Sequence, residues 1–187
     1  MSDELDVVFL DRDGTLNRDD EGYLADPDRV VLLPGATEAV RSLNAAGIKA
    51  VVVTNQSGIG RGLISQEDLA RIHERLIALL AAGGAILDGI FVCPHRPEHG
   101  CTCRKPGAEL ALRAARDLGV DPSRSAMIGD QPADVALAHR LGGRAVLVLT
   151  GKGRETAAGL TADVHPPHYV ARDVFEAVSW LLEQGRR

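Results

Sequence analysis

Two aspartates separated by one residue follow the first apolar run of the chain. The run is Val7 to Leu10, and the polar segment Asp11 to Thr15 comes directly after it. An apolar run with β-branched residues that ends in a charged, glycine-containing turn predicts a buried strand. Side chains on an extended chain repeat every second residue, so Asp11 and Asp13 should point the same way. A bound cation relieves the repulsion of such a pair. We therefore expect a Mg²⁺-assisted site with one carboxylate as nucleophile and the other as acid and base. A solvated turn is the alternative.

Two further apolar runs end in polar loops. Ile48 to Val53 is rich in β-branched residues, and the small hydrogen-bonding residues Thr54 to Gly58 follow it. Such a loop can hold phosphate oxygens with hydroxyl and N–H groups, although a simple polar turn is the alternative. Ala126 to Ile128 leads into Gly129 to Asp134, which adds two carboxylates. Ligands in open α/β sheets bind at the carboxyl ends of the strands, so these loops should contribute to one site.

A lysine lies between these two loops in the sequence. The segment Arg104 to Gly107 opens a predicted helix that runs to about Leu118, with Pro106 near its first turn. A lysine there offers a point charge for a phosphate, and a merely solvated lysine is the alternative. Four loops therefore carry carboxylate, hydroxyl, lysine and carboxylate in that order, which four independent turns would not explain.

The order and spacing of these motifs resemble those of the haloacid dehalogenase-like superfamily of aspartate-nucleophile phosphatases. The match spans residues 6 to about 150. The resemblance implies that Asp11 attacks phosphorus, and that Asp13 protonates the leaving oxygen and then deprotonates water. It also implies that Thr54 and Lys105 hold the phosphoryl oxygens. The implied Mg²⁺ ligands are Asp11, the carbonyl of Asp13 and Asp130, with Asp134 in support.

All three cysteines of the chain lie within eleven residues that also contain a histidine. Four such ligands suit tetrahedral Zn²⁺, and a site with no open position would be structural. A disulfide is the alternative, but the odd number of cysteines and the cytosolic character of the chain disfavour it. His99 could compete with His95, yet matching one-residue gaps favour His95. The predicted zinc ligands are Cys93, His95, Cys101 and Cys103.

Length and composition predict one domain over residues 1–187, with 45% hydrophobic residues. Apolar residues recur at helical spacing in Gly35 to Ala46 and from Ser65 to about Ala82, where Ser65 should be the N-cap. Further strands are expected over Ile86 to Val92 and Ala145 to Leu149, with a last helix over Arg172 to Glu183. With the resemblance, these elements predict an α/β, three-layer Rossmann-like sandwich around a central, mostly parallel sheet.

The spacing of the motifs leaves no room for a cap domain. Forty residues separate Asp13 from Thr54, and 50 separate Thr54 from Lys105. Helices, strands and the zinc-binding loop use most of them, so the protein should be capless, with substrate choice left to loops.

Charge and apolar content exclude several classes of partner. The chain has 21 Lys and Arg against 26 Asp and Glu, a net charge of −5, and no concentrated basic stretch. We therefore expect no nucleic-acid partner. No apolar run approaches the ~20 residues needed to span a bilayer, and the amino terminus has no signal-peptide pattern. A cytoplasmic monomer is expected, and resemblance to known phosphatases implies that its substrate is a small phosphorylated sugar.

Two capless subfamilies with a zinc loop come close within the superfamily. The D,D-heptose 1,7-bisphosphate phosphatases resemble this chain through the segments Leu10 to Asn17, Gly22-Tyr23 and Thr54 to Gly62. The implied reaction removes the C7 phosphate of D-glycero-D-manno-heptose 1,7-bisphosphate, and Arg104 would recognise the phosphate that is not cleaved. The implied substrate contacts are Asp19, Asp20, Glu21, Gly22, Tyr23, Asn55, Gln56, Ser57, Arg104 and Gln131.

Two alternatives stay open. The histidinol-phosphate phosphatases have a similarly short zinc loop, and Gln131 replaces the basic residue that both subfamilies usually carry after Gly-Asp. A zinc-stabilised binding domain without turnover is the other alternative. The sequence disfavours it, because Asp11, Asp13, Thr54, Lys105 and Asp130 are all present.

Overall fold

The computed structural model describes residues 4–19, 23–160 and 165–185, and its centre is a parallel sheet of six strands. The strand order is β3-β2-β1-β4-β5-β6, and every pairing between these strands is parallel. The strands are β1 (Val7–Leu10), β2 (Lys49–Asn55), β3 (Gly89–Cys93), β4 (Ser125–Gly129), β5 (Arg144–Val148) and β6 (Tyr169–Ala171). The predicted, mostly parallel sheet is therefore confirmed, and it is parallel throughout the described residues.

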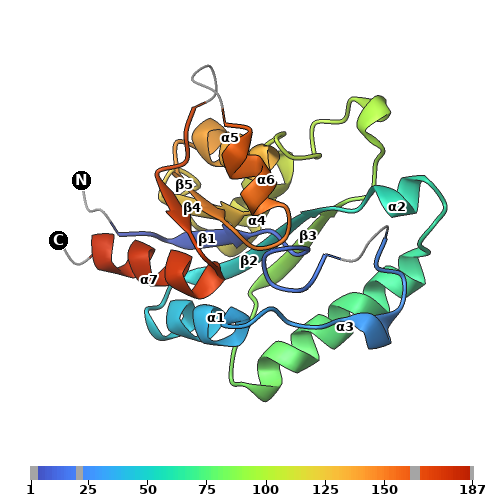
Figure 1. Cartoon of the computed structure of the whole chain (residues 1–187), viewed down its shortest axis with the longest axis horizontal. Helices are drawn as coiled ribbons and strands as arrows, with labels where there is room; N and C mark the ends of the chain where they lie inside the picture. The colour runs from blue at the N-terminus through green and yellow to red at the C-terminus, as the bar shows by residue number, and fades with distance from the viewer. Residues whose placement is uncertain (1–3, 20–22, 161–164, 186–187) are drawn as a thin grey trace.

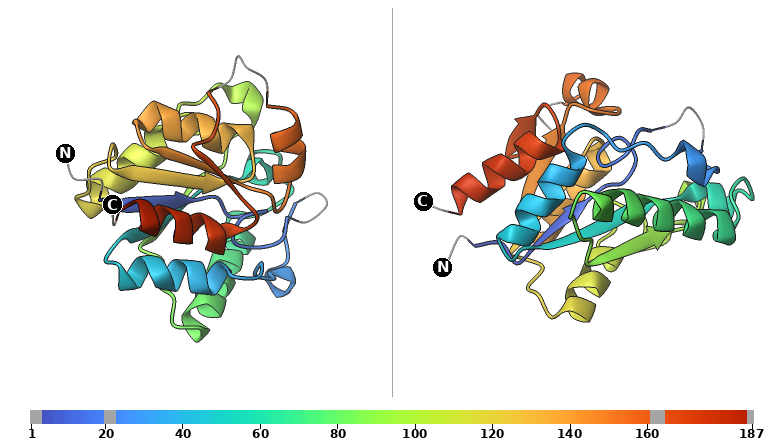
Figure 2. Two further views of the ribbon diagram at one scale, coloured as in Figure 1. Left: turned by 60° about the vertical axis from the view of Figure 1, so that its left-hand side comes forward. Right: turned by 90° about the horizontal axis from the view of Figure 1, so that it is seen from below.

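Helices cover both faces of this sheet. One layer contains α1 (Ala36–Ala45), α3 (Gln66–Ala82) and α7 (Val174–Gln184), and the other contains α4 (Glu109–Leu118) and α5 (Pro132–Leu141), as Figures 1 and 2 show. The short helices are η1 (Pro27–Arg29), α2 (Ser57–Gly60), η2 (Pro97–His99) and α6 (Gly153–Ala158). The predicted three-layer α/β sandwich is confirmed.

Strand β1 shows how the sequence produces two cores. Its residues alternate between the faces, as side chains on a strand must. Val7 and Phe9 pack with residues of α4 and α5, whereas Val8 and Leu10 pack with residues of α1, α3 and α7. Because both faces are covered, the strand is a continuous apolar run.

The helix after Lys105 begins later than the sequence predicts. We expected the segment Arg104 to Gly107 to open it, with Pro106 near the first turn, but α4 starts at Glu109, and the peptide bond between Lys105 and Pro106 is cis. The side chain of Asn55 explains the difference: its Oδ1 accepts from Lys105 N at 2.9 Å, and its Nδ2 donates to Lys105 O at 3.2 Å. The backbone of Lys105 is thus held by β2 and not by a helical turn. The expected N-cap of α3 is confirmed, because Ser65 Oγ accepts from Asp68 N at 2.9 Å.

The chain reverses its direction across the sheet at β1. From β1 it moves outward to β2 and β3, then returns to β4 on the other side of β1 and continues to β5 and β6. Such a reversal opens a crevice outside the carboxyl ends of the central strands. Between β1 and β2 the described residues form only η1 and α1 as helices, so this described part of the chain contributes no cap domain over the crevice. Among the described residues, no helix combines the length and apolarity needed to cross a membrane.

Candidate active site

A cavity of about 140 Å³ lies at this crevice. Segments that follow β1, end β2 and follow β4 contribute to it, together with the loop that precedes α4. Its lining includes Asp11, Asp13, Asp19, Tyr23, Thr54, Asn55, Gln56, Arg104, Lys105, Gln131, Asp134 and Lys152. The fold therefore brings together most of the residues that the sequence proposed for the site.

A buried lysine joins two of the carboxylates. Lys105 Nζ lies 2.7 Å from Asp11 Oδ1 and 2.7 Å from Asp134 Oδ1, and the lysine is only 4% exposed. Burial opposes its charge, but the two carboxylates prevail and raise the pKa of Lys105. Burial raises the pKa of Asp11 to about 7, with neighbouring Asp134 and Asp130 adding to the rise and Lys105 opposing it. Such a lysine remains a full positive charge beside the proposed nucleophile.

The carboxylate of Asp13 is held by four hydrogen bonds. Its Oδ1 accepts from Arg12 Nε at 3.0 Å and from Asn17 Nδ2 at 2.9 Å. Its Oδ2 accepts from Arg12 Nη2 at 2.7 Å and from Gln56 Nε2 at 2.8 Å. Burial favours the neutral acid, but the guanidinium of Arg12 and these donors outweigh it and lower the pKa of Asp13. The group is thus a carboxylate in the protein without substrate.

Thr54 and its neighbours have different tasks. Gln56 Nε2 donates to Thr54 Oγ1 at 2.9 Å as well as to Asp13, so this amide links β2 to the β1 loop. Asn55 anchors Lys105, as described above. We proposed Asn55 and Gln56 as substrate contacts. They line the cavity, and their amides also orient the residues around it.

Asp130 lies beneath two glycines. Gly14 and Gly151 both have positive φ, and a Cβ at either position would collide with the Asp130 carboxylate. Asp130 Oδ2 accepts from Lys152 N at 2.7 Å, whereas the buried Oδ1 has no hydrogen-bond partner. Burial raises the pKa of Asp130 to about 6.

Three buried carboxylates could hold a cation. Oxygens of Asp11, Asp130 and Asp134 lie within 4.8 Å of one another. Carboxylate oxygens are the donors that Mg²⁺ prefers. The buried Asp130 Oδ1 has no hydrogen-bond partner and can serve as a ligand, so the donor set fits Mg²⁺.

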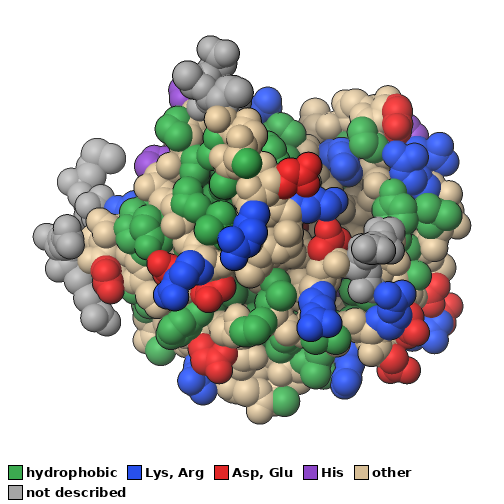
Figure 3. Space-filling view, in the orientation of Figure 1, with side chains coloured by type: hydrophobic (Ala, Val, Ile, Leu, Met, Phe, Trp, Pro, Cys, Tyr) green, Lys and Arg blue, Asp and Glu red, His purple; other side chains and the backbone are tan. Residues whose placement is uncertain are grey.

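The proposed substrate contacts fall into three groups. Asp19, Tyr23, Arg104 and Gln131 line the cavity. Ser57 does not, but its Oγ lies 3.4 Å from the hydroxyl of Tyr23. Asp20, Glu21 and Gly22 lie outside the described residues. In Figure 3, Lys and Arg side chains border a recess that also contains acidic side chains, which suits an anionic substrate bound with a cation.

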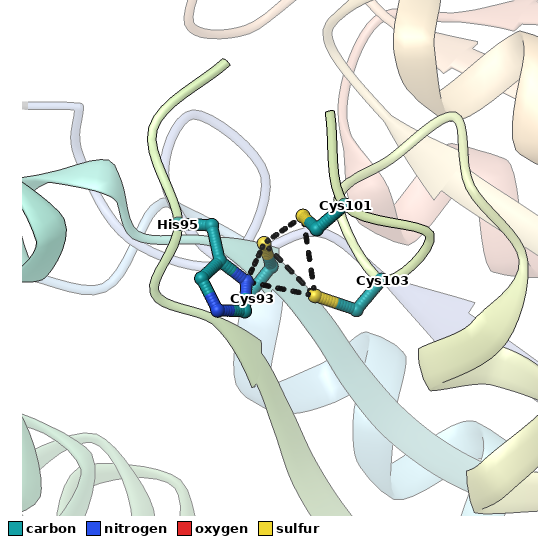
Figure 4. Close-up of side chains that lie close together, drawn as sticks. All are labelled: Cys93, His95, Cys101 and Cys103. Carbon is teal, nitrogen blue, oxygen red and sulfur yellow. Dashed lines mark hydrogen bonds between the residues drawn. The ribbon is translucent and has the colours of Figure 1, made fainter. Parts of the chain in front are cut away.

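The cysteines and one histidine form a second cluster, shown in Figure 4. The sulfur–sulfur distances are 3.6 Å for Cys93–Cys101, 3.3 Å for Cys93–Cys103 and 3.4 Å for Cys101–Cys103. His95 Nδ1 lies 3.2 Å from the Cys103 sulfur and 3.8 Å from that of Cys93. Tetrahedral Zn²⁺ with Zn–S bonds of about 2.3 Å places sulfurs about 3.8 Å apart, so the cluster fits zinc closely. All three cysteines are free thiols, and His99 is not one of the clustered groups.

Sequence reasoning missed two residues beside Asp13. Arg12 was given no role, yet its side chain is 1% exposed and holds Asp13. His73 was given no role either, yet its Nε2 lies 3.2 Å from Arg12 Nη1. A signal existed, because His73 follows Leu69 by four residues and precedes Leu76 by three, which places it beside the buried stripe of α3.

Lys152 was also missed. It lies in the glycine-containing loop after β5, lines the cavity and donates its backbone N–H to Asp130. Its Nζ lies 3.6 Å from Asp19 Oδ2. Ligand-binding loops in such sheets follow the strands, so the loop after β5 could have been examined for Lys152 on that ground.

Comparisons with known proteins agree with this geometry. Residues 102–177 match a family model described as "HAD-hyrolase-like". A D-glycero-D-manno-heptose-1,7-bisphosphate 7-phosphatase from Thermosynechococcus vestitus is 40% identical over 186 residues, covering 94% of each chain. A D-glycero-beta-D-manno-heptose-1,7-bisphosphate 7-phosphatase from Bordetella bronchiseptica is 40% identical over 152 residues, covering 81% of this chain and 85% of the relative.

A solved structure is similar over nearly its whole length. It is the crystal structure of D,D-heptose 1,7-bisphosphate phosphatase from B. bronchiseptica complexed with magnesium and phosphate. The TM-score is 0.88 at 36% sequence identity, and the alignment covers 96% of this chain and 99% of that one. The similarity therefore extends over nearly the whole of both chains.

Proposed function

This chain belongs to the haloacid dehalogenase-like phosphatases and, within them, to the heptose-1,7-bisphosphate 7-phosphatases, and we propose that it removes the C7 phosphate of D-glycero-D-manno-heptose 1,7-bisphosphate. The observation that carries this proposal is the convergence of Asp11, Asp13, Thr54 and Lys105 on one cavity. A nucleophile, an acid and base, a hydroxyl and a cation are the groups that a two-step phosphate transfer needs.

In the first step, an Asp11 oxygen attacks phosphorus and forms an aspartyl phosphate. The bond between phosphorus and the C7 oxygen breaks, and Asp13 gives that oxygen its proton. An incoming phosphate dianion raises the pKa of Asp13, because a nearby like charge disfavours the carboxylate. The ammonium of Lys105 and the hydroxyl of Thr54 stabilise the phosphoryl oxygens in the transition state.

In the second step, Asp13 is the base. It takes a proton from water, whose oxygen attacks phosphorus and breaks the bond to Asp11. Inorganic phosphate leaves, and Asp11 is again a free carboxylate. The four hydrogen bonds to Asp13 keep it ionised once it has lost its proton, and the ionised carboxylate is the form that can act as the base.

We propose that Mg²⁺ is held by Asp11, the Asp13 carbonyl and Asp130. The unsatisfied Asp130 oxygen supports this assignment. Asp134 supports the site indirectly, because its two oxygens are engaged by Lys105 and by Gln131 N at 3.0 Å. When bound, Mg²⁺ neutralises phosphoryl charge and orients the phosphate toward the attacking carboxylate.

The cysteine–histidine cluster is the second proposed metal site. We propose one structural Zn²⁺ on Cys93, His95, Cys101 and Cys103, supported by their tetrahedral spacing. This ion would tie the end of β3 to the segment that precedes Arg104 and Lys105.

Arg104 is the proposed contact for the second phosphate. It lines the cavity beside Lys105, and its Nη1 lies 3.5 Å from His95 O, which leaves the other nitrogen donors available in this arrangement. A guanidinium binds a phosphate through paired hydrogen bonds. This is the feature that favours a bisphosphate over a monophosphate.

A substrate panel with saturating Mg²⁺ tests the proposal. The panel contains both anomers of the heptose 1,7-bisphosphate, histidinol phosphate and fructose 1,6-bisphosphate, with released phosphate as the measurement. We expect a heptose bisphosphate to have the highest kcat/KM and to yield the 1-phosphate. Preference for histidinol phosphate would refute the substrate, and no turnover with any of them would refute the enzyme assignment.

A further inference from the structure

The side chain of Arg12 is buried between the proposed acid and base and helix α3. It is 1% exposed and among the largest fully buried side chains in the described part of the chain. Its Nε and Nη2 bind the two oxygens of Asp13, at 3.0 Å and 2.7 Å. Burying a long cationic side chain is costly unless its donors are satisfied, so this placement requires a specific set of partners.

His73 supplies the partner on the other side of the guanidinium. Its Nε2 lies 3.2 Å from Arg12 Nη1. An arginine can only donate, so His73 must accept at Nε2, which makes its imidazole neutral. Burial lowers the pKa of His73 to about 4, and the charge of Arg12 adds to this effect. The neutral ring therefore receives a hydrogen bond from the cation and does not repel it.

Helix α3 gives this contact a rigid base. Ile72 precedes His73 in sequence, and Leu76 lies about one helical turn after it. Both are fully buried in the core between α3 and the sheet. His73 thus reaches the β1 loop from an element that cannot shift easily. With Nη1 held by His73 and with Nε and Nη2 on Asp13, the guanidinium plane has little freedom to rotate, and the carboxylate is oriented with it.

We propose that Arg12 and His73 are positioning residues that set the direction of the Asp13 carboxyl group for proton transfer. The inference rests on the proposed function, because it concerns the acid step of that reaction. Proton transfer depends on hydrogen-bond distance and alignment, so a small rotation of Asp13 slows the departure of a leaving group that needs a proton. A leaving group that departs as a stable anion should be affected much less.

The test compares two substrates and a matched pair of variants. His73→Leu removes the acceptor, and His73→Gln offers a side-chain carbonyl that can accept from Arg12. The substrates are heptose 1,7-bisphosphate, which releases an alkoxide, and p-nitrophenyl phosphate, which releases a stabilised phenolate. The measured quantity is kcat/KM, because it covers the steps through departure of the alcohol and excludes hydrolysis of the aspartyl phosphate.

For His73→Leu, we expect kcat/KM to fall about tenfold for the heptose substrate and less than about twofold for the aryl phosphate, the scale of one lost hydrogen bond to a charged group. His73→Gln should restore most of the loss. Arg12→Lys should show the same selectivity with a larger fall, because an ammonium cannot bind both Asp13 oxygens in a fixed plane.

Equal losses on both substrates, or no loss in His73→Leu, would overturn the positioning role. A wild-type protein that releases no phosphate from either substrate would instead refute the proposed function, and this inference with it. Circular dichroism and the melting temperature of each variant identify any that fail to fold. If His73→Leu does not fold, His73→Gln and Arg12→Lys still test the proposal. The expected pattern is then that His73→Gln turns over both substrates without impairment, whereas Arg12→Lys loses kcat/KM selectively for the heptose substrate.

Discussion

The carboxylate site and the cysteine–histidine cluster are both suited to metals, but they are assembled differently. The carboxylates come from the ends of β1 and β4, far apart in the sequence, and the cations Lys105 and Arg12 already partner Asp11 and Asp13. The other cluster comes from a single segment of eleven residues and contains no cation. One region is therefore held by the sheet and by opposite charges, whereas the other depends on its own four ligands.

This difference predicts different tasks for the two metals. The carboxylate site borders a cavity and has an unsatisfied buried oxygen on Asp130, so a ligand can enter and complete it. The cysteine–histidine cluster supplies four ligands and leaves no position for a substrate. We therefore expect loss of Mg²⁺ to stop the chemistry, and loss of zinc to reduce stability.

The two regions meet at Arg104 and Lys105. These residues follow Cys103 directly, and both line the cavity. Lys105 is fixed independently by Asn55, whereas Arg104 contacts the backbone of His95 within the cysteine–histidine cluster. Disorder in that cluster should consequently affect Arg104 before it affects Lys105.

The largest expected effect is that of Asp11→Asn. An amide cannot form the aspartyl phosphate, so phosphate release should fall by at least about 10⁴-fold, the scale seen when a nucleophile is removed. The fold should persist, because the sheet still holds this region and Lys105 keeps its ion pair with Asp134. Phosphate-release assays and circular dichroism measure the two properties. Appreciable turnover by a folded variant would refute the assignment of Asp11.

Zinc removal should show the opposite pattern. With Mg²⁺ kept saturating, a zinc-selective chelator or Cys103→Ser should lower the melting temperature by on the order of 10 °C, because metal binding contributes directly to folding. Activity assayed at a temperature well below the melting temperature should be affected less than stability. Asp130→Asn is the matched comparison, and it should reduce activity severely with little loss of stability.

Metal analysis of the purified protein sharpens the same comparison. We expect about one zinc per chain. An absence of zinc, or a stable disulfide among the three cysteines, would contradict the structural-zinc proposal.

Arg104→Ala tests the residue at which the carboxylate site and the cysteine–histidine cluster meet. Loss of a charged hydrogen bond should lower kcat/KM for heptose 1,7-bisphosphate by about tenfold to a hundredfold, with much less change for a generic monophosphate. Arg61→Ala is a suitable control, because Arg61 pairs with Glu98 at 3.4 Å and does not line the cavity. Equal losses on both substrates would assign Arg104 to the reacting phosphate or to the zinc-binding loop.

The smallest expected effect is the contribution of His73 to stability. Folding lowers the pKa of His73 to about 4 from 6.5, so the unfolded chain binds the proton more readily. The stability from neutral His73 is present above pH 6.5 and is lost as the pH falls toward 4. Between pH 7 and pH 5, wild type should lose up to about 2 kcal/mol more unfolding free energy than His73→Gln. Urea denaturation at both pH values measures this difference, and identical losses would contradict a neutral, half-buried His73.

Much of the site was predictable because its signals are local. An apolar run that stops at a polar loop marks the end of a buried strand, and this pattern located Asp11, Thr54 and Asp130. The cysteine–histidine cluster was equally visible, because four potential ligands within eleven residues need no long-range folding to meet.

The start of α4 shows where local signals fail. A proline preceded by basic residues is typical of a first helical turn. Here the backbone groups of Lys105 bond to Asn55, 50 residues earlier, and the helix starts at Glu109. Nothing in the segment itself identifies that partner.

The sequence by itself determined the order of the elements, the strand ends that carry polar groups and the composition of both clusters, because periodicity and residue type express these properties locally. Only the tertiary structure decided which groups touch. Arg12 and His73 are 61 residues apart, and Lys105 meets Asp11 and Asp134 only because β1, β2 and β4 are neighbours in the sheet. Such contacts depend on strand order and on how helices pack across a face, and neither property is encoded in the spacing of residues along one segment.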